Sequence, residues 1–215
     1  MNKLYYEKVF STQRMDKYFK RYPNESNKAI THYHLNIELS ESFYSCLSMF
    51  EIALRNSLNR ELSDKFGKDW YLKLASIPGL KNLKGNINTA KKHIINRNEN
   101  ITANKVVAEL TLGFWVRLLN AEYELTLWKP LRRAFPYLEK RQKQRNKVSA
   151  PINKIRNFRN RVFHHEPISW NLKKLEEMHN TIFMVMTWLN KDLPKIAAEF
   201  DRVDEVIQKA KKLIE

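Results

Sequence analysis

Apolar residues recur at helical spacing along the middle of this chain, and no segment alternates apolar and polar residues over more than about four positions. From Leu39 to Phe66 the apolar residues fall three or four positions apart. That spacing places them on one face of an α-helix. We expect Asn36 or Ser40 to open this helix and Gly67 to close it. The members of the stripe between its two ends are Phe43, Leu47, Phe50, Leu54, Leu58 and Leu62.

The same periodicity predicts an all-α fold for the rest of the chain. We expect a turn at Ile77-Pro78-Gly79 and a polar connector over 81–88. Ser149 is expected to cap a helix over about 150–166, which Pro167 ends. No repeat and no Gly/Ser linker divides the 215 residues, so residues 1–215 are expected to form a single domain. Further helices are expected over 90–95, 102–119, 128–135, 170–189 and 201–213.

The chain is strongly basic, with 39 Lys and Arg against 23 Asp and Glu and a formal net charge of +16. Such a balance favours a polyanionic partner, most often a nucleic acid. The charge is concentrated in two stretches, residues 81–97 with no acid and residues 139–161 with Glu139 as the single acid. A solvated helix face is the ordinary explanation for one such run, but two runs favour a groove for a polyanion. The residues expected to bind RNA are Lys91, Lys92, Lys140, Arg141, Lys143, Arg145, Lys147, Lys154, Arg156 and Arg161.

Several function classes are disfavoured by the same composition. Cys46 is the single cysteine, so neither a disulfide framework nor a multi-thiolate zinc site is possible within one chain. His32 and His34 lack a neighbouring cluster of acids or thiols, so we expect no metal and no cofactor. No apolar signal region and no run of about 18 apolar residues is present, which predicts a cytoplasmic protein without a membrane partner.

The segment from Arg156 to Ile168 combines arginines, asparagine and two histidines near the end of the expected helix. Asn160 and His164 are four residues apart and share one helix face, which Arg159 flanks. A histidine can transfer a proton, and an arginine can hold a phosphate and stabilise added negative charge. Asn160 could orient the ring or the substrate. The alternative is that His164 only caps the helix end.

The string Arg159-Asn160-Arg161-Val162-Phe163-His164-His165-Glu166-Pro167-Ile168 resembles the signature of the Abi-like abortive-infection proteins, a branch of the HEPN superfamily. Three other stretches resemble the same family in the same order, and the likeness spans about Tyr18 to Leu189. They are 39–44 with 51–56, then 69–71, then 109–116.

This resemblance implies a HEPN-type helical bundle with additional N- and C-terminal helices. It also implies a metal-independent endoribonuclease that cleaves RNA by 2′-hydroxyl attack, with Arg159, Asn160 and His164 as its site. HEPN sites are usually composite, so one motif per chain implies a homodimer. Abi-like proteins are antiphage effectors or toxins, and some are restrained by a regulatory RNA or a protein antitoxin.

Three residues could support that site, namely His165, Glu51 and Arg55. Glu51 and Arg55 are four apart, so an ordinary intrahelical ion pair is the alternative for them. Two other functions stay open for the whole chain. One is a non-catalytic RNA-binding module, because some HEPN domains have lost catalysis. The other is a protein that binds anionic membrane surfaces.

Overall fold

The computed structural model describes residues 3–74, 76–77 and 80–214. Over these residues the chain forms thirteen α-helices joined by short 3-10 and π segments, and the described part contains no β-strand. The all-α prediction is therefore confirmed. The turn expected at Pro78 and Gly79 lies outside the described residues.

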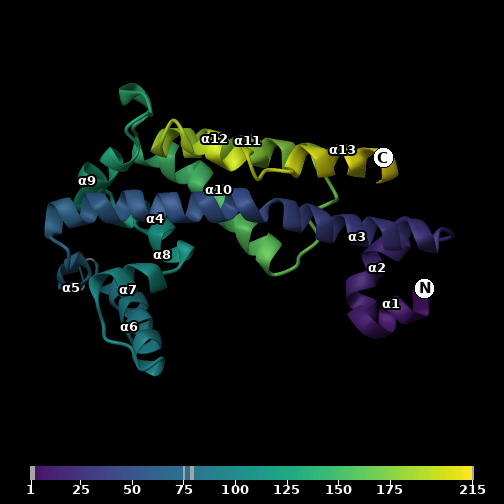
Figure 1. The fold of residues 1–215 in the computed structure, drawn as a ribbon, viewed down its shortest axis with the longest axis horizontal. Coiled ribbons are helices and arrows are strands. Elements are labelled where there is room, and N and C mark those ends of the chain that lie inside the picture. Colours follow the sequence, from purple (N-terminus) through teal and green to yellow (C-terminus); the bar gives the residue numbers. More distant parts are fainter. Residues whose placement is uncertain (1–2, 75, 78–79, 215) are drawn as a thin grey trace.

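Two helices, α3 (Ser26–Ser42) and α4 (Tyr44–Phe66), form a rod along the long axis of the molecule (Figure 1). Phe43 joins them with helical backbone angles, φ −75° and ψ −13°, so the rod is about 60 Å long by its 1.5 Å rise per residue. The apolar stripe that begins at Leu39 is buried along α4 as expected. Gly67 ends the helix with a φ of 88°, a conformation that side chains disfavour.

The expected start of this helix is wrong, because the helix begins at Ser26 and not at Asn36 or Ser40. Ser40 lies inside α3 and donates its hydroxyl to the carbonyl of Asn36, four residues earlier. Such back-bonding lets a serine stay within a helix that packing stabilises.

The C-terminal helices form a layer along one side of the rod (Figure 1). Here α11 (Leu172–Leu189) packs against α4, and α13 (Val203–Ile214) packs against α3. The short α12 (Leu193–Ala198) joins them, with Pro194 in its first turn. Helix α10 (Arg145–Phe163) contacts α11 and the short α8 (Leu112–Arg117), so its apolar face is buried in the main core.

The N-terminal helices α1 (Lys3–Phe10) and α2 (Thr12–Arg21) build a second, smaller core against α3. Aromatic residues dominate this core, and its rings meet mostly edge to face. Its members are Tyr6, Met15, Tyr18, Phe19, Tyr22, Ala29, Ile30 and Tyr33. These helices lie near one end of the rod (Figure 1).

Two of the remaining helices differ from what the sequence predicts. The expected connector over 81–88 is wrong, because α6 (Lys81–Asn96) is helical throughout and buries Leu83, Ile87, Ala90 and Ile94. Thr102 does cap a helix, since its hydroxyl accepts from the amide of Lys105, but α7 (Ala103–Glu109) ends early. Thr111 then caps α8. The five-residue α5 (Trp70–Leu74) precedes α6.

The segment between α8 and α10 is a series of single turns, where one short helix was expected over 128–135. Pro130 stands at the start of α9 (Lys129–Leu131), which is followed at once by a 3-10 turn over Arg132–Ala134. The other turns are Ala121–Tyr123, Glu124–Trp128 and Lys140–Gln142.

Candidate active site

Helix α10 carries the motif and is longer at its start than expected. It begins at Arg145, and the expected cap Ser149 is instead buried one turn inside it, where its hydroxyl accepts from the guanidinium of Arg145. Pro151 lies in the second turn of α10, where it removes one backbone N–H donor from the helix. The helix buries Val148, Ile152, Ile155, Phe158 and Val162 against the core.

The motif helix ends at Phe163, and His164 is its C-cap. His165 follows with a φ of 56°, in the left-handed region. Its amide donates to the carbonyl of Val162 at 3.1 Å, and the amide of Glu166 donates to that of Arg161 at 2.9 Å. These two bonds form a Schellman motif, which usually has glycine at the position of His165. A non-glycine residue there costs about 1 kcal/mol, so the neighbouring contacts must hold the turn.

Those contacts come from helices far away in the sequence. Arg14 of α2 donates through Nη1 to the carbonyl oxygen of His165 at 2.8 Å. Asn36 of α3 accepts, through Oδ1, the amides of Ile168 at 2.7 Å and Ser169 at 3.1 Å. The loop that follows the motif helix is therefore fixed by α2 and α3, and with it the position of His164.

The buried ring of His32 completes this attachment. Its Nε2 lies 3.0 Å from the hydroxyl of Ser169, and its ring meets Trp170 edge to face at 4.6 Å. Burial lowers the pKa of His32 to about 4, because an imidazolium would lose its hydration there. His34 points to a different partner, the hydroxyl of Tyr6 at 2.7 Å. The two histidines therefore do not share a metal site.

This burial makes folding stability depend on pH. An unfolded chain protonates His32 near its ordinary pKa of about 6.5, whereas the folded chain does so only near 4. The free energy of unfolding should therefore fall by about 1.4 kcal/mol per pH unit between these two values, on account of this group. Urea unfolding at pH 7.5 and at pH 5, for wild type and His32→Gln, should show a flatter pH dependence in the variant. Equal slopes in both proteins would contradict this assignment.

Arg159 is held in place on the exposed side of α10. Its guanidinium lies over the ring of Phe163 at 4.1 Å, and its Nε is 3.4 Å from Oε2 of Glu51 on α4. Only 29% of its side chain is exposed, and its Nε makes no hydrogen bond within the described structure. Glu51 thus pairs with Arg159 across the helices. Arg55 reaches only the carbonyl of Ala108, at 3.5 Å.

Asn160 and His164 lie one turn apart at the end of the same helix. Both are exposed, and the amide of His164 donates to the carbonyl of Asn160 at 2.8 Å. The structure therefore places an imidazole and an amide one turn apart at the end of α10, with Arg159 next to Asn160 in sequence. Within the described residues His164 is exposed to solvent.

A pocket of about 320 Å³ opens beside these histidines, and α2 forms its other wall. Arg14 and Lys17 add two positive charges to it, and sequence analysis did not select either. The sequence did contain a pattern from which they could have been found. In residues 12–21, Met15, Tyr18 and Phe19 form one apolar helix face, and the basic residues lie between them on the exposed face. The pocket is lined by Ser11, Gln13, Arg14, Lys17, His164, His165, Glu166 and Pro167.

The residues expected to bind RNA are in several different environments. Three of the arginines pair with carboxylates, Arg141 with Glu139, Arg145 with Glu124 and Arg161 with Glu166. Arg156 bonds Asn157, Lys143 bonds the carbonyl of Pro136, and Lys91 lies over the ring of Tyr71. Among the residues that the structure describes, the side chains exposed without such a partner are Lys92, Lys140, Lys147 and Lys154. The basic stretch 139–161 is therefore not one continuous face leading to His164.

One of the comparisons with known proteins identifies a family. The family model for the Abi-like protein matches residues 3–171. The chain therefore belongs to the Abi-like family, which associates it with abortive infection. Searches of curated proteins and of solved structures gave no match.

Within the part of the chain that the structure describes, no three His, Cys, Asp or Glu side chains are grouped so that they could hold a metal ion. The helices of that part include none with the length and apolar character needed to cross a bilayer.

Proposed function

We propose that this Abi-like protein is a metal-independent endoribonuclease of the HEPN type, acting in the cytoplasm as an antiphage effector or toxin. The observation that carries the proposal is the end of α10, where Arg159 is held by Glu51 and Phe163 beside an exposed His164. The pocket with Arg14 and Lys17 adds positive charge for a phosphate next to the same histidine. RNA brings its own nucleophile, the 2′-hydroxyl.

In the proposed reaction His164 takes the proton of the 2′-hydroxyl. The 2′ oxygen then bonds to phosphorus, and the bond from phosphorus to the 5′ oxygen breaks. Arg159 stabilises the negative charge that develops on the phosphate oxygens. The departing 5′ oxygen takes a proton from a second acid, which leaves a 2′,3′-cyclic phosphate and a 5′-hydroxyl.

The second acid would be His164 of a second copy of the chain. This is one reason for proposing a homodimer with a composite site.

The other reason for proposing a homodimer is the exposed apolar surface around Arg159. The ring of Tyr44 lies 5.8 Å from that of Phe163, and Ile52 follows Tyr44 two turns along α4. Ile37 lines a neighbouring pocket with His165. All four side chains are exposed in the single chain, as an unpartnered interface would be.

Replacing Arg159 by lysine tests its role. The variant keeps the positive charge but loses the planar fork that can contact two phosphate oxygens and the stacking on Phe163. We expect RNA cleavage in EDTA to fall by roughly 10²-fold, mainly in kcat, because one oxyanion donor is worth that much. Rates measured across RNA concentrations give kcat and KM separately. If Arg159→Lys has the kcat of wild type, Arg159 does not stabilise the proposed transition state.

The second candidate is an RNA-binding module without catalysis, restrained by or restraining a regulatory RNA. The exposed lysines away from His164 favour RNA binding in either case. A protein antitoxin is the other proposed regulator. Binding without cleavage by wild type in EDTA would favour the module, whereas cleavage lost in the Arg159 and His164 variants favours the enzyme.

A further inference from the structure

A strongly basic surface lies around α9, at the opposite end of α10 from His164. Two pockets adjoin there, because both are lined by Arg132 and Arg133. Lys65, Lys129 and Pro130 complete the first pocket, and Lys140 and Lys143 complete the second. Six cations from α4, α9 and the following turns therefore line two neighbouring hollows, although they come from separate parts of the sequence.

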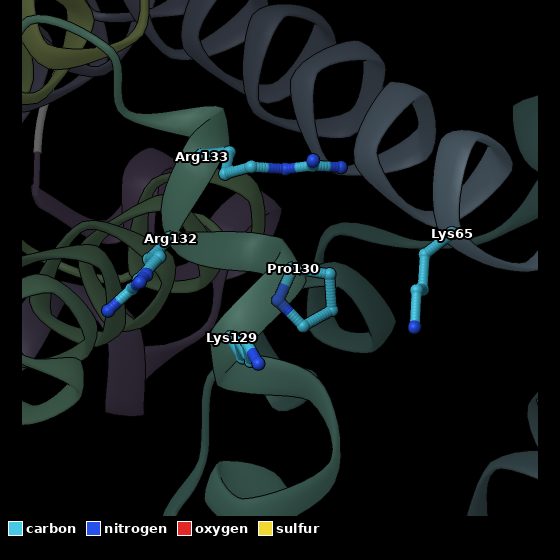
Figure 2. Close-up of a pocket in the computed structure, with 5 residues that line it drawn as sticks. All are labelled: Lys65, Lys129, Pro130, Arg132 and Arg133. Carbon is cyan, nitrogen blue, oxygen red and sulfur yellow. The ribbon is translucent and has the colours of Figure 1, made fainter.

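Figure 2 shows how the first pocket is built. Arg133 reaches from the α9 segment towards α4, Lys65 projects from α4, and Pro130 lies between them. Arg132 projects in this view to the other side of the segment, and it also lines the second pocket. Pro130 and the aliphatic stems of the basic side chains can supply apolar contacts in such a pocket.

These charges are mostly uncompensated. Among the described residues, Arg133 alone of the six pairs with a carboxylate, Glu61, at 2.7 Å. Lys65, Lys129, Arg132 and Lys140 have no carboxylate within ion-pair distance. Mutual repulsion of such a cluster is relieved when an anion binds, and each cation of the protein that neutralises an RNA phosphate releases condensed counterions, which favours binding.

We propose that these adjoining pockets, which we call the α9 basic cleft, bind successive backbone phosphates of single-stranded RNA. A row of separate cations around an open hollow suits a polymer of phosphates. One small phosphorylated ligand would need converging donors in an enclosed site. The proposal rests on the proposed function for the identity of the polyanion. It adds a second contact region, so that one strand can extend from the cleft to His164.

The length of α10 sets the spacing of the two regions. Lys140 and Lys143 lie just before α10, whereas His164 caps its other end, and 19 helical residues rise by about 28 Å. A stacked strand advances about 3.4 Å per phosphate, so about eight nucleotides span that distance, and fewer when the strand is extended. Substrates much shorter than this cannot occupy both regions at once.

The test uses a fluorescein-labelled oligouridine whose 2′ oxygens are all methylated, so that the proposed cleavage cannot occur. Anisotropy titrations in EDTA compare wild type with the double variant Lys129→Ala/Arg132→Ala. The matched control is Lys173→Ala/Lys174→Ala, which removes the same charge from exposed positions on α11. At about 0.1 M salt we expect roughly tenfold weaker binding in the cleft variant, with a salt slope smaller by about 1.4, and little change in the control.

Several outcomes would contradict RNA binding by the α9 basic cleft. Equally weakened RNA binding in both double variants would mean that only net charge matters. Unchanged RNA binding in the cleft variant would mean that the cleft is not a binding site. If the cleft variant no longer sediments with phosphatidylserine vesicles but still binds RNA as wild type does, the cleft residues bind a membrane surface instead. An unlabelled RNA of about three nucleotides, too short to reach both regions, should be cleaved equally by wild type and cleft variant. If wild type binds RNA through the cleft but does not cleave it, the proposed catalysis is wrong and the proposed binding role of the cleft is supported.

Discussion

Alanine in place of His164 is expected to reduce RNA cleavage by about 10³-fold, because general acid–base catalysis by one positioned histidine contributes about 10²- to 10⁴-fold. In a two-fold dimer the variant removes both histidines, the base and the acid of the proposed reaction. RNA affinity should change little, since His164 is exposed and makes no side-chain bond that holds the fold. Single-turnover cleavage of a labelled strand in EDTA measures the loss directly.

The neighbouring histidine provides the matched control. His165 occupies the left-handed position of the Schellman motif, so His165→Gly keeps the turn and relieves its strain. We expect this variant to fold at least as well as wild type and to retain most of its cleavage. A loss as large in His165→Gly as in His164→Ala would show that the two histidines had been assigned the wrong roles.

The second large effect is expected at Asn36, where alanine removes the acceptor of two buried amides. The amides of Ile168 and Ser169 would then be left without a partner in a buried position. Each unsatisfied group costs about 1–3 kcal/mol, so we expect Asn36→Ala to lower the free energy of unfolding by about 2–4 kcal/mol. Cleavage should also fall in the folded fraction, because the loop after His164 loses its attachment to α3.

Urea denaturation measures the stability change, and Asn56→Ala is its control. Asn56 is an exposed asparagine on α4, so its replacement should shift the unfolding free energy by no more than about 0.5 kcal/mol. Similar small shifts in both variants would mean that Asn36 does not anchor the loop.

Periodicity predicted several helices, because burial of an apolar face is what stabilises them, but it did not predict α1, α2 or the first half of α6. The α4 stripe and Gly67 were both found from spacing alone. Helix starts were less predictable. Asn36 and Ser149 have the residue types of N-caps, yet both lie inside helices. There Asn36 bonds the loop after α10, and Ser149 accepts from Arg145 of its own helix. A residue type that can cap can equally make bonds of these kinds, and the local sequence does not distinguish them.

The candidate site was only partly predictable for a related reason. Arg159, Asn160 and His164 lie within six positions, so helical geometry alone could group them. Contacts with Glu51 and Arg14 depend on how α4 and α2 pack against α10, which spacing cannot give. The α9 basic cleft was missed because its cations come from separate elements, and only Lys140 and Lys143 stood in the basic stretch of the sequence.

The central claim is that His164 and Arg159 cleave RNA through its own 2′-hydroxyl. The most direct measurement compares two labelled strands in EDTA, one all-ribose and one with a single 2′-deoxy nucleotide at a mapped cleavage position. We expect wild type to cut the ribose strand, leaving a 2′,3′-cyclic phosphate, and to leave the deoxy position uncut. Cleavage at the deoxy position, or cleavage that appears only when a divalent metal is added, would contradict the claim.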